Sequence, residues 1–145
     1  MTTQESIVSE ARALIGLPFR HLGRGPFAFD CLGVVLQSFK CAGVLPAEVD
    51  FTGYSTNVSD YELEQHLDGS PHLERLSNWR ESEPADILLQ RFHVALPASH
   101  LRLITMRQGD ALWGVHAGRR GVVEQRIMHI ERNRAAYRLK EVAHG

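Results

Sequence analysis

The first half of the chain carries apolar residues at helical spacing in two stretches. Over residues 4–15, helical spacing places Ile7, Ala11, Leu14 and Ile15 on one face, which predicts a helix with that face buried. Gly16 and Pro18 then end this helix. A second helix is predicted to begin at Asp30, whose carboxylate can cap the first turn, and to end near Gly43. Apolar positions cover much of its circumference, which predicts a helix buried in the middle of the domain.

The second half changes to short runs that are typical of strands. Residues 47–84 show no clear period, although 61–76 fit one helix or two short ones broken near Gly69. After Pro84 come five strand-like runs separated by turn signals, at 86–91, 100–106, 111–117, 121–127 and 135–142. This order predicts an α+β domain, with N-terminal helices packed on a C-terminal antiparallel meander of about five strands. We expect one domain over 1–145, in which 45–83 is a variable, insertion-like segment.

Composition excludes several classes of protein. Apolar residues make up 43% of the chain and charged residues 23%, which suits an ordinary core and excludes disorder. With 16 basic and 17 acidic side chains, no overall attraction to nucleic acid or to an anionic membrane is expected. The N-terminus lacks the basic start and apolar run of a secretory signal, and no stretch approaches the roughly 20 apolar residues of a membrane span. We therefore expect synthesis in the cytoplasm without a signal peptide, and no membrane partner.

Cys31 is the first candidate for chemistry. Cys31 and Cys41 are too few for a disulfide framework and are expected to be free thiols. Cys31 falls at the first position of the second helix, where unpaired amides lower a thiol pKa and can bind an oxyanion. Gly33 would leave room for a substrate backbone, whereas Asp30 would oppose thiolate formation unless it caps the helix. A lone cysteine is often only a small buried residue, and Cys41 is interpreted that way.

Two histidines are placed to act with this thiol. His100 opens one predicted strand, and His116 lies near the end of the next. Because the start of one antiparallel strand lies beside the end of its neighbour, the two side chains should meet at one edge of the sheet. One imidazole could then accept the thiol proton while the other orients the first.

Five short motifs carry a resemblance to a known family. They read GLPFR at 16–20, FDCLGVV at 29–35, PADILL at 84–89, SHLRL at 99–103 and VHA at 115–117. In this order they resemble the G-x-P-Y, D-C-x-G, P-G-D, S-H-V-G-I and I-H-A motifs of the NlpC/P60 family of cell-wall cysteine peptidases. The likeness spans roughly 11–127, and 45–83 carries none of it.

The resemblance implies a papain-like fold and a set of roles. Cys31 would be the nucleophile, His100 the general base and acid, and His116 the orienting residue. The implied reaction is hydrolysis of an amide in the peptide stems of peptidoglycan, typically beside a D-glutamyl residue, through an S-acyl enzyme with no metal and no cofactor. The version with Cys-Leu-Gly and a long middle segment looks most like phage-tail and prophage members. Delivery by a phage tail, with tail-tip proteins as partners, is therefore the leading hypothesis, ahead of a contact-dependent antibacterial effector.

Three positions depart from the family pattern. Phe19 stands where the family has a tyrosine that helps at the oxyanion, and losing one such donor can cost about 100–1000-fold in rate. His21, in the same loop, is a candidate substitute. Leu32 replaces a common serine, with a modest expected effect. Arg102 replaces the glycine after the base, on the face of His100, where it would either crowd the site or bind a stem carboxylate.

Other interpretations stay open. His93 competes with His100 as the base, but Pro97 interrupts its run as a strand, and His100 keeps better spacing to His116. The same scaffold could serve an amidase, a deamidase or an acyltransferase, or a non-catalytic tail-tip protein. One cysteine and two histidines could bind zinc, but no fourth ligand or short-spaced pair supports this. The remaining histidines are interpreted as loop or surface residues: His21, His66, His72, His129 and His144.

Overall fold

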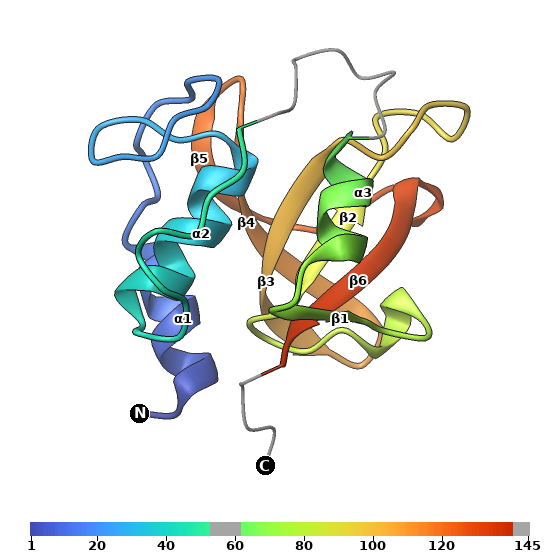
Figure 1. Ribbon diagram of the computed structural model, residues 1–145. Coiled ribbons are helices and arrows are strands. Elements are labelled where there is room, and N and C mark those ends of the chain that lie inside the picture. Colours follow the sequence, from blue (N-terminus) through green and yellow to red (C-terminus); the bar gives the residue numbers. More distant parts are fainter. Residues whose placement is uncertain (53–61, 141–145) are drawn as a thin grey trace.

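A computed structural model describes residues 1–52 and 62–140, and Figure 1 shows the path of the chain. The helices are α1 (Thr3–Arg12), α2 (Cys31–Cys41) and α3 (Glu62–Gly69), with short 3-10 turns η1 (Trp79–Glu81) and η2 (Ile130–Arg132). The strands are β1 (Leu73–Arg75), β2 (Ile87–Gln90), β3 (His100–Gln108), β4 (Ala111–Gly118), β5 (Gly121–Arg126) and β6 (Asn133–Leu139). Most helical residues precede most strand residues, so the predicted α+β class is confirmed.

The first helix is shorter than the apolar pattern predicts. It begins with a capping box, in which Thr2 and Glu5 each accept the other's backbone N–H. It ends at Arg12, because Gly16 turns the chain with φ +97° and donates its N–H to the Val122 carbonyl of β5 at 2.9 Å. Ile15, expected on the buried face, is 44% exposed as a result.

The sheet follows the predicted meander for only part of its width. Its order is β1-β6-β2-β3-β4-β5, and all its pairings are antiparallel. Strands β2 to β5 are neighbours in chain order, but β6 crosses back to pair with the free edge of β2. All four residues of β2 are buried, so this strand is central and needs a partner on each side. The predicted end of the last strand, at 142, lies outside the described residues.

Part of the segment 45–83 completes the edge of the sheet. Helix α3 fits the predicted helix over 61–76, apart from Tyr61, which lies outside the described residues. The second half of that stretch forms β1 instead, which pairs with β6 and is the sixth strand of the described sheet. Asp68 of α3 accepts from the Tyr137 hydroxyl at 2.6 Å and pairs with Arg75 at 3.0 Å. These bonds connect α3 to both β1 and β6.

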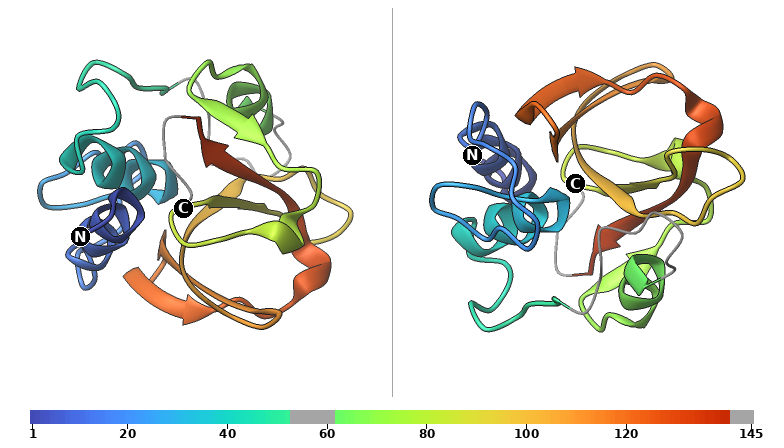
Figure 2. Two further views of the ribbon diagram at one scale, coloured as in Figure 1. Left: turned by 90° about the horizontal axis from the view of Figure 1, so that it is seen from below. Right: turned by 90° about the horizontal axis from the view of Figure 1, so that it is seen from above.

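The core lies between the helices and one face of the sheet. Figure 2 shows the curled sheet with α1 and α2 together on one side of it. Eight of the eleven residues of α2 are buried, as its apolar circumference predicts. The opposite face of the sheet carries a smaller apolar cluster, formed by Leu88, Ile104, Leu112, Ile127 and Ala136. No described helix is long and apolar enough to cross a bilayer.

Candidate active site

The start of α2 is fixed by the carboxylate of Asp30. As the N-cap residue, Asp30 accepts from the Gly33 N–H at 2.7 Å through Oδ1 and from the Leu22 N–H at 3.0 Å through Oδ2. The Arg24 guanidinium lies 2.8 Å from Oδ1. Asp30 is 3% exposed. Asp30 therefore borders the site, and its oxygens hold the loop 16–29 to the helix.

Gly33 serves the packing of this loop. A Cβ at Gly33 would collide with the backbone carbonyl of Gly23. The space that the sequence assigns to a substrate backbone is therefore occupied by the chain itself. The glycine allows the loop to lie directly on the first turn of α2, next to Cys31.

Cys31 is the first residue of α2, as predicted, and its side chain is only 9% exposed. Burial raises the pKa of the thiol to about 12, and the neighbouring Asp30 carboxylate adds to the rise. The backbone amides of Leu101 and Leu32 oppose this increase without overcoming it. The expectation of a thiol pKa lowered by the helix N-terminus is wrong for this resting state, because desolvation outweighs the helix amides. Cys31 rests as a neutral thiol, while Cys41 is exposed at the far end of the same helix.

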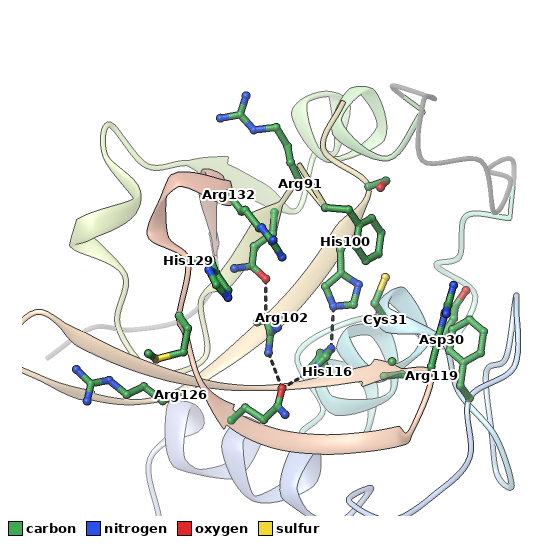
Figure 3. Close-up of a pocket in the computed structure, with 18 of the residues that line it drawn as sticks. Asp30, Cys31, Arg91, His100, Arg102, His116, Arg119, Arg126, His129 and Arg132 are labelled. Atoms are coloured by element: carbon green, nitrogen blue, oxygen red, sulfur yellow. Dashed lines mark hydrogen bonds between the residues drawn. The ribbon is translucent and has the colours of Figure 1, made fainter. Parts of the chain in front are cut away.

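His100 and His116 meet as the strand arrangement predicts. His100 Nε2 lies 2.8 Å from His116 Nδ1, and the two rings are perpendicular. The side chains come from adjacent strands β3 and β4. Figure 3 shows the Cys31 sulfur beside the His100 ring, with His116 on its other side. The structure thus brings together the three residues that the sequence singled out.

Gln125 and Arg102 fix the protonation pattern of the histidine pair. Arg102 Nη1 lies 3.5 Å from Gln125 Oε1, and the same oxygen lies 3.1 Å from His116 Nε2. A guanidinium only donates, so the amide oxygen of Gln125 must face it, and His116 Nε2 must carry a hydrogen. His116 Nδ1 is then an acceptor and His100 Nε2 the donor. His100 Nδ1 is left with a free lone pair, which is the form required of a base.

Burial keeps both imidazoles neutral. Desolvation lowers the pKa of His100 well below 6.5, and the neighbouring His116 and Arg102 lower it further. Burial, followed by the charge of Arg102, likewise lowers the pKa of His116 to about 4, although the Gln125 hydrogen bond opposes the change. The resting site therefore contains a neutral thiol and a neutral base, which is not a thiolate–imidazolium pair.

These groups open into a cleft of about 1030 Å³. Phe19, His21 and Arg102 line it together with Cys31, so every candidate site residue borders the same space. Phe19 is 43% exposed and brings no hydroxyl. Arg102 lies on the face of His100, as alternation predicts, and its Nε donates to Gln90 Oε1 at 2.6 Å.

Sequence reasoning missed Gln125. The β4–β5 hairpin turns between Gly118 and Gly121 and pairs His116 with Val123. Gln125 lies two residues further along β5, on the same face of the sheet as Val123. The turn signal alone could therefore have placed Gln125 beside His116.

Of the other described histidines, His21 and His129 line the same cleft as Cys31, whereas His66, His72 and His93 do not. His93 does not line the cleft, and its Nδ1 accepts the N–H of Ala95 at 3.1 Å. His66 stacks on Phe51. His129 is exposed, as expected, yet it lines the cleft, and His144 lies outside the described residues. Within residues 1–52 and 62–140, no group of three His, Cys, Asp or Glu side chains could hold a metal ion.

Solved structures share this architecture. No protein-family model matches the sequence, and no curated protein matches it. The NlpC/p60 domain of peptidoglycan hydrolase SagA is similar over 94% of this chain and 98% of that domain, with a TM-score of 0.62 and 17% identity. NlpC1 from Trichomonas vaginalis is similar over 86% of this chain and 39% of its own, with a TM-score of 0.59 and 16% identity. A lipoprotein-like protein of the NLP/P60 family from Staphylococcus aureus is similar over 94% of this chain and 41% of its own, with a TM-score of 0.58 and 17% identity.

This chain therefore spans less than half of the Trichomonas and Staphylococcus chains and nearly all of the SagA domain. The shared part is the arrangement of α1 and α2 on one side of an antiparallel sheet. The fold of this chain is that of the NlpC/P60 domains.

Proposed function

We propose that this chain is a cysteine hydrolase that cleaves an amide bond in the peptide stems of peptidoglycan through an S-acyl enzyme. One observation carries the proposal: a buried cysteine at a helix N-terminus lies beside a histidine whose other nitrogen is held by a second polar side chain. This is the arrangement of nucleophile, base and orienting group that acyl transfer requires. The fold supports the substrate class, since SagA, which shares it, is named a peptidoglycan hydrolase.

In the proposed reaction, His100 Nδ1 accepts the Cys31 proton as the sulfur attacks the substrate carbonyl carbon. The neutral resting pair means that the proton moves during the attack and not before it. The tetrahedral intermediate then collapses, the C–N bond breaks, and the His100 imidazolium protonates the leaving amine. A thioester to Cys31 remains. His100 next removes a proton from water, which attacks the thioester, releases the carboxylic acid and restores the thiol.

The oxyanion needs hydrogen-bond donors, and the family tyrosine is replaced by Phe19. The first-turn amides of a helix have no intrahelical partner, and the Gly33 amide is already bonded to Asp30. We therefore assign the oxyanion contact to the backbone N–H of Cys31. His21, which lines the same cleft, is the second donor in this proposal.

The orienting groups act through His100. His116 holds Nε2 of His100, and Gln125 holds His116 in turn. Removing either bond would let the ring rotate or change tautomer, so that the lone pair no longer faces the sulfur.

The direct test is to incubate the protein with purified peptidoglycan and separate the products by liquid chromatography and mass spectrometry. Wild type should release stem fragments with new amine and carboxyl ends, and Cys31→Ala should release none. Cys41→Ala is the matched control, because this second cysteine is exposed on the same helix and should leave activity unchanged. Absence of products from wild type, or equal release by Cys31→Ala, would overturn the proposal and favour a structural role for the fold.

A further inference from the structure

The cleft beside Cys31 is strongly cationic. Five arginines line it, whereas Asp30 is its sole carboxylate, among the described residues. Asp30 is already neutralised by Arg24. A concave, partly desolvated surface with one sign of charge concentrates its electric field and attracts ligands of the opposite sign.

Four of these arginines form one side of the cleft, which we call the arginine wall: Arg91, Arg102, Arg126 and Arg132. In Figure 3 they lie on one side of the His100–His116 pair, and Arg119 and Asp30 lie on the other. Arg91 directly follows β2, Arg126 and Arg132 are the last residues of β5 and η2, and Arg102 is the third residue of β3. Because these arginines come from four separate parts of the chain, no single helix or turn accounts for their clustering.

Carboxylate partners distinguish the wall from the rest of the protein. In residues 1–52 and 62–140, the arginines that form an ion pair with a carboxylate all lie outside the cleft: Arg12, Arg24, Arg75, Arg107, Arg134 and Arg138. Arg102 is partly buried and bonds only to the neutral amides of Gln90 and Gln125. Buried cations are normally paired, so an uncompensated guanidinium that faces a cleft favours an anionic ligand.

Two residues that line the cleft carry buried polar atoms without hydrogen-bond partners. In the part of the chain that the structure describes, three buried side-chain atoms lack a hydrogen-bond partner: Arg91 Nε, Ser99 Oγ and Asn133 Nδ2. Arg91 and Ser99 line the cleft, and Asn133 accepts a bond from the cleft residue Gln90 at 2.8 Å. Buried polar groups are rarely left without partners, and a peptide bound in the cleft could reach the two that belong to cleft-lining residues, Arg91 and Ser99.

We propose that the arginine wall is a subsite for the carboxylates of an acidic peptide substrate, so that the cleft selects stem peptides with free carboxylates over their amidated forms. This rests on the hydrolase function proposed above and deepens it by naming a substrate property. Guanidinium and carboxylate groups match in bidentate geometry, and a neutral amide in the same place would lose the charge-assisted part of each bond. The volume of the cleft suits a peptide of a few residues.

The test compares two peptides that differ in one group. One is a tripeptide with a γ-D-glutamyl residue whose α-carboxylate is free, and the other is its α-amide. Binding to Cys31→Ala is measured by calorimetry at low and moderate salt, because this variant binds without turnover. The free carboxylate should bind about 10–100-fold more tightly than the amide, and the difference should shrink as salt rises.

Substitutions then locate the effect. On the Cys31→Ala background, the double substitution Arg126→Gln with Arg132→Gln should remove most of the preference, because it weakens binding of the free carboxylate much more than binding of the amide. Arg120→Gln is the matched control, because Arg120 is exposed and does not line the cleft. Equal affinity for the two peptides, binding of neither, or a preference that survives the double substitution would overturn the proposed subsite.

Hydrolysis by the wild-type protein separates this proposal from the first. Equal cleavage of both peptides would keep the hydrolase and reject the arginine-wall subsite. Charge-selective binding without cleavage of either peptide would keep the subsite and reject the hydrolase. Failure of both measurements would reject both proposals.

Discussion

The protonation state of Cys31 gives a prediction that needs no substrate. In the Cys41→Ser variant Cys31 is the single remaining thiol. This variant is treated with iodoacetamide at a series of pH values. Because only the thiolate reacts, the rate of labelling reports how much thiolate the folded site allows. For a thiolate–imidazolium pair the labelling rate is constant near neutral pH, whereas for a neutral thiol–imidazole pair it rises with pH.

The expected labelling rate follows from the shift in the pKa of the Cys31 thiol. Moving the thiol pKa from 9.0 to about 12 lowers the thiolate fraction about 1000-fold at any pH below 9. The more basic thiolate is about 20-fold more nucleophilic, because the Brønsted coefficient is about 0.45. Labelling of folded Cys41→Ser should therefore be about 50-fold slower than labelling of the same chain in denaturant, before restricted access is counted.

The assay is mass spectrometry of the intact protein over a time course. The rate for the folded protein should rise about tenfold per pH unit from pH 6 to 9, as expected for a thiol far below its pKa. The denatured chain gives the unperturbed reference, and Cys31→Ser reports the exposed Cys41 alone. In wild type, Cys41 should be labelled before Cys31.

A labelling rate of Cys31 that is rapid and constant between about pH 5 and 8 would contradict the neutral thiol, since that is the behaviour of an ion pair. It would show that the helix amides and His100 outweigh desolvation in solution. The same argument applies to catalysis, where the neutral pair predicts that kcat/KM does not decline on the alkaline side near pH 8–9.

Three further predictions concern the supports of the site. Gln125→Leu removes the hydrogen-bond acceptor of His116. Long-range ¹H–¹⁵N NMR should then show that His100 no longer has only the Nε2–H tautomer, and kcat should fall by up to about 100-fold. An unchanged tautomer would contradict the proposed role of Gln125 in fixing the protonation of the histidine pair. The pKa of His116 is about 4 in the folded protein and near 6.5 in the unfolded chain. As pH falls, the unfolded chain therefore binds a proton at His116 before the folded protein does. The free energy of unfolding should therefore fall by roughly 2–3 kcal/mol as pH drops from 6.5 to 4, and urea titrations showing a plateau over that range would argue against it. Arg138→Ala leaves the 1%-exposed Asp86 carboxylate without its guanidinium, and should lower the free energy of unfolding by about 3–5 kcal/mol in chemical denaturation, where a loss below 1 kcal/mol would count against a buried pair.

The placement of the reactive residues could be predicted from the sequence because each depends on local rules. The Asp30 cap fixes the start of α2, and antiparallel pairing brings His100 beside His116. Both follow from short-range geometry that a single sequence contains. The strand content after Pro84 was predictable for the same reason.

The protonation state of Cys31 could not be predicted from the sequence in the same way. The thiol pKa depends on how completely β3 and the loop 16–29 enclose Cys31, and enclosure is a property of tertiary packing. The pairing of β6 with β2 could not be predicted either, because the sequence indicates which segments form strands but not which strands pair with each other. The arginine wall was missed because its members lie far apart in the sequence and meet only in the folded sheet.

The contact between Gly23 and Gly33 has a consequence for protein design. The first turn of α2 is rigid because a separate loop rests on it, backbone against backbone, and is locked there by the Asp30 carboxylate. Grafting the tetrapeptide 30–33 onto another helix would transfer the sequence without the loop that supports the first turn beside the thiol. The smallest transplantable unit runs from Gly16 to the end of α2, and it needs a strand from the recipient to close over the sulfur as Leu101 does in this protein.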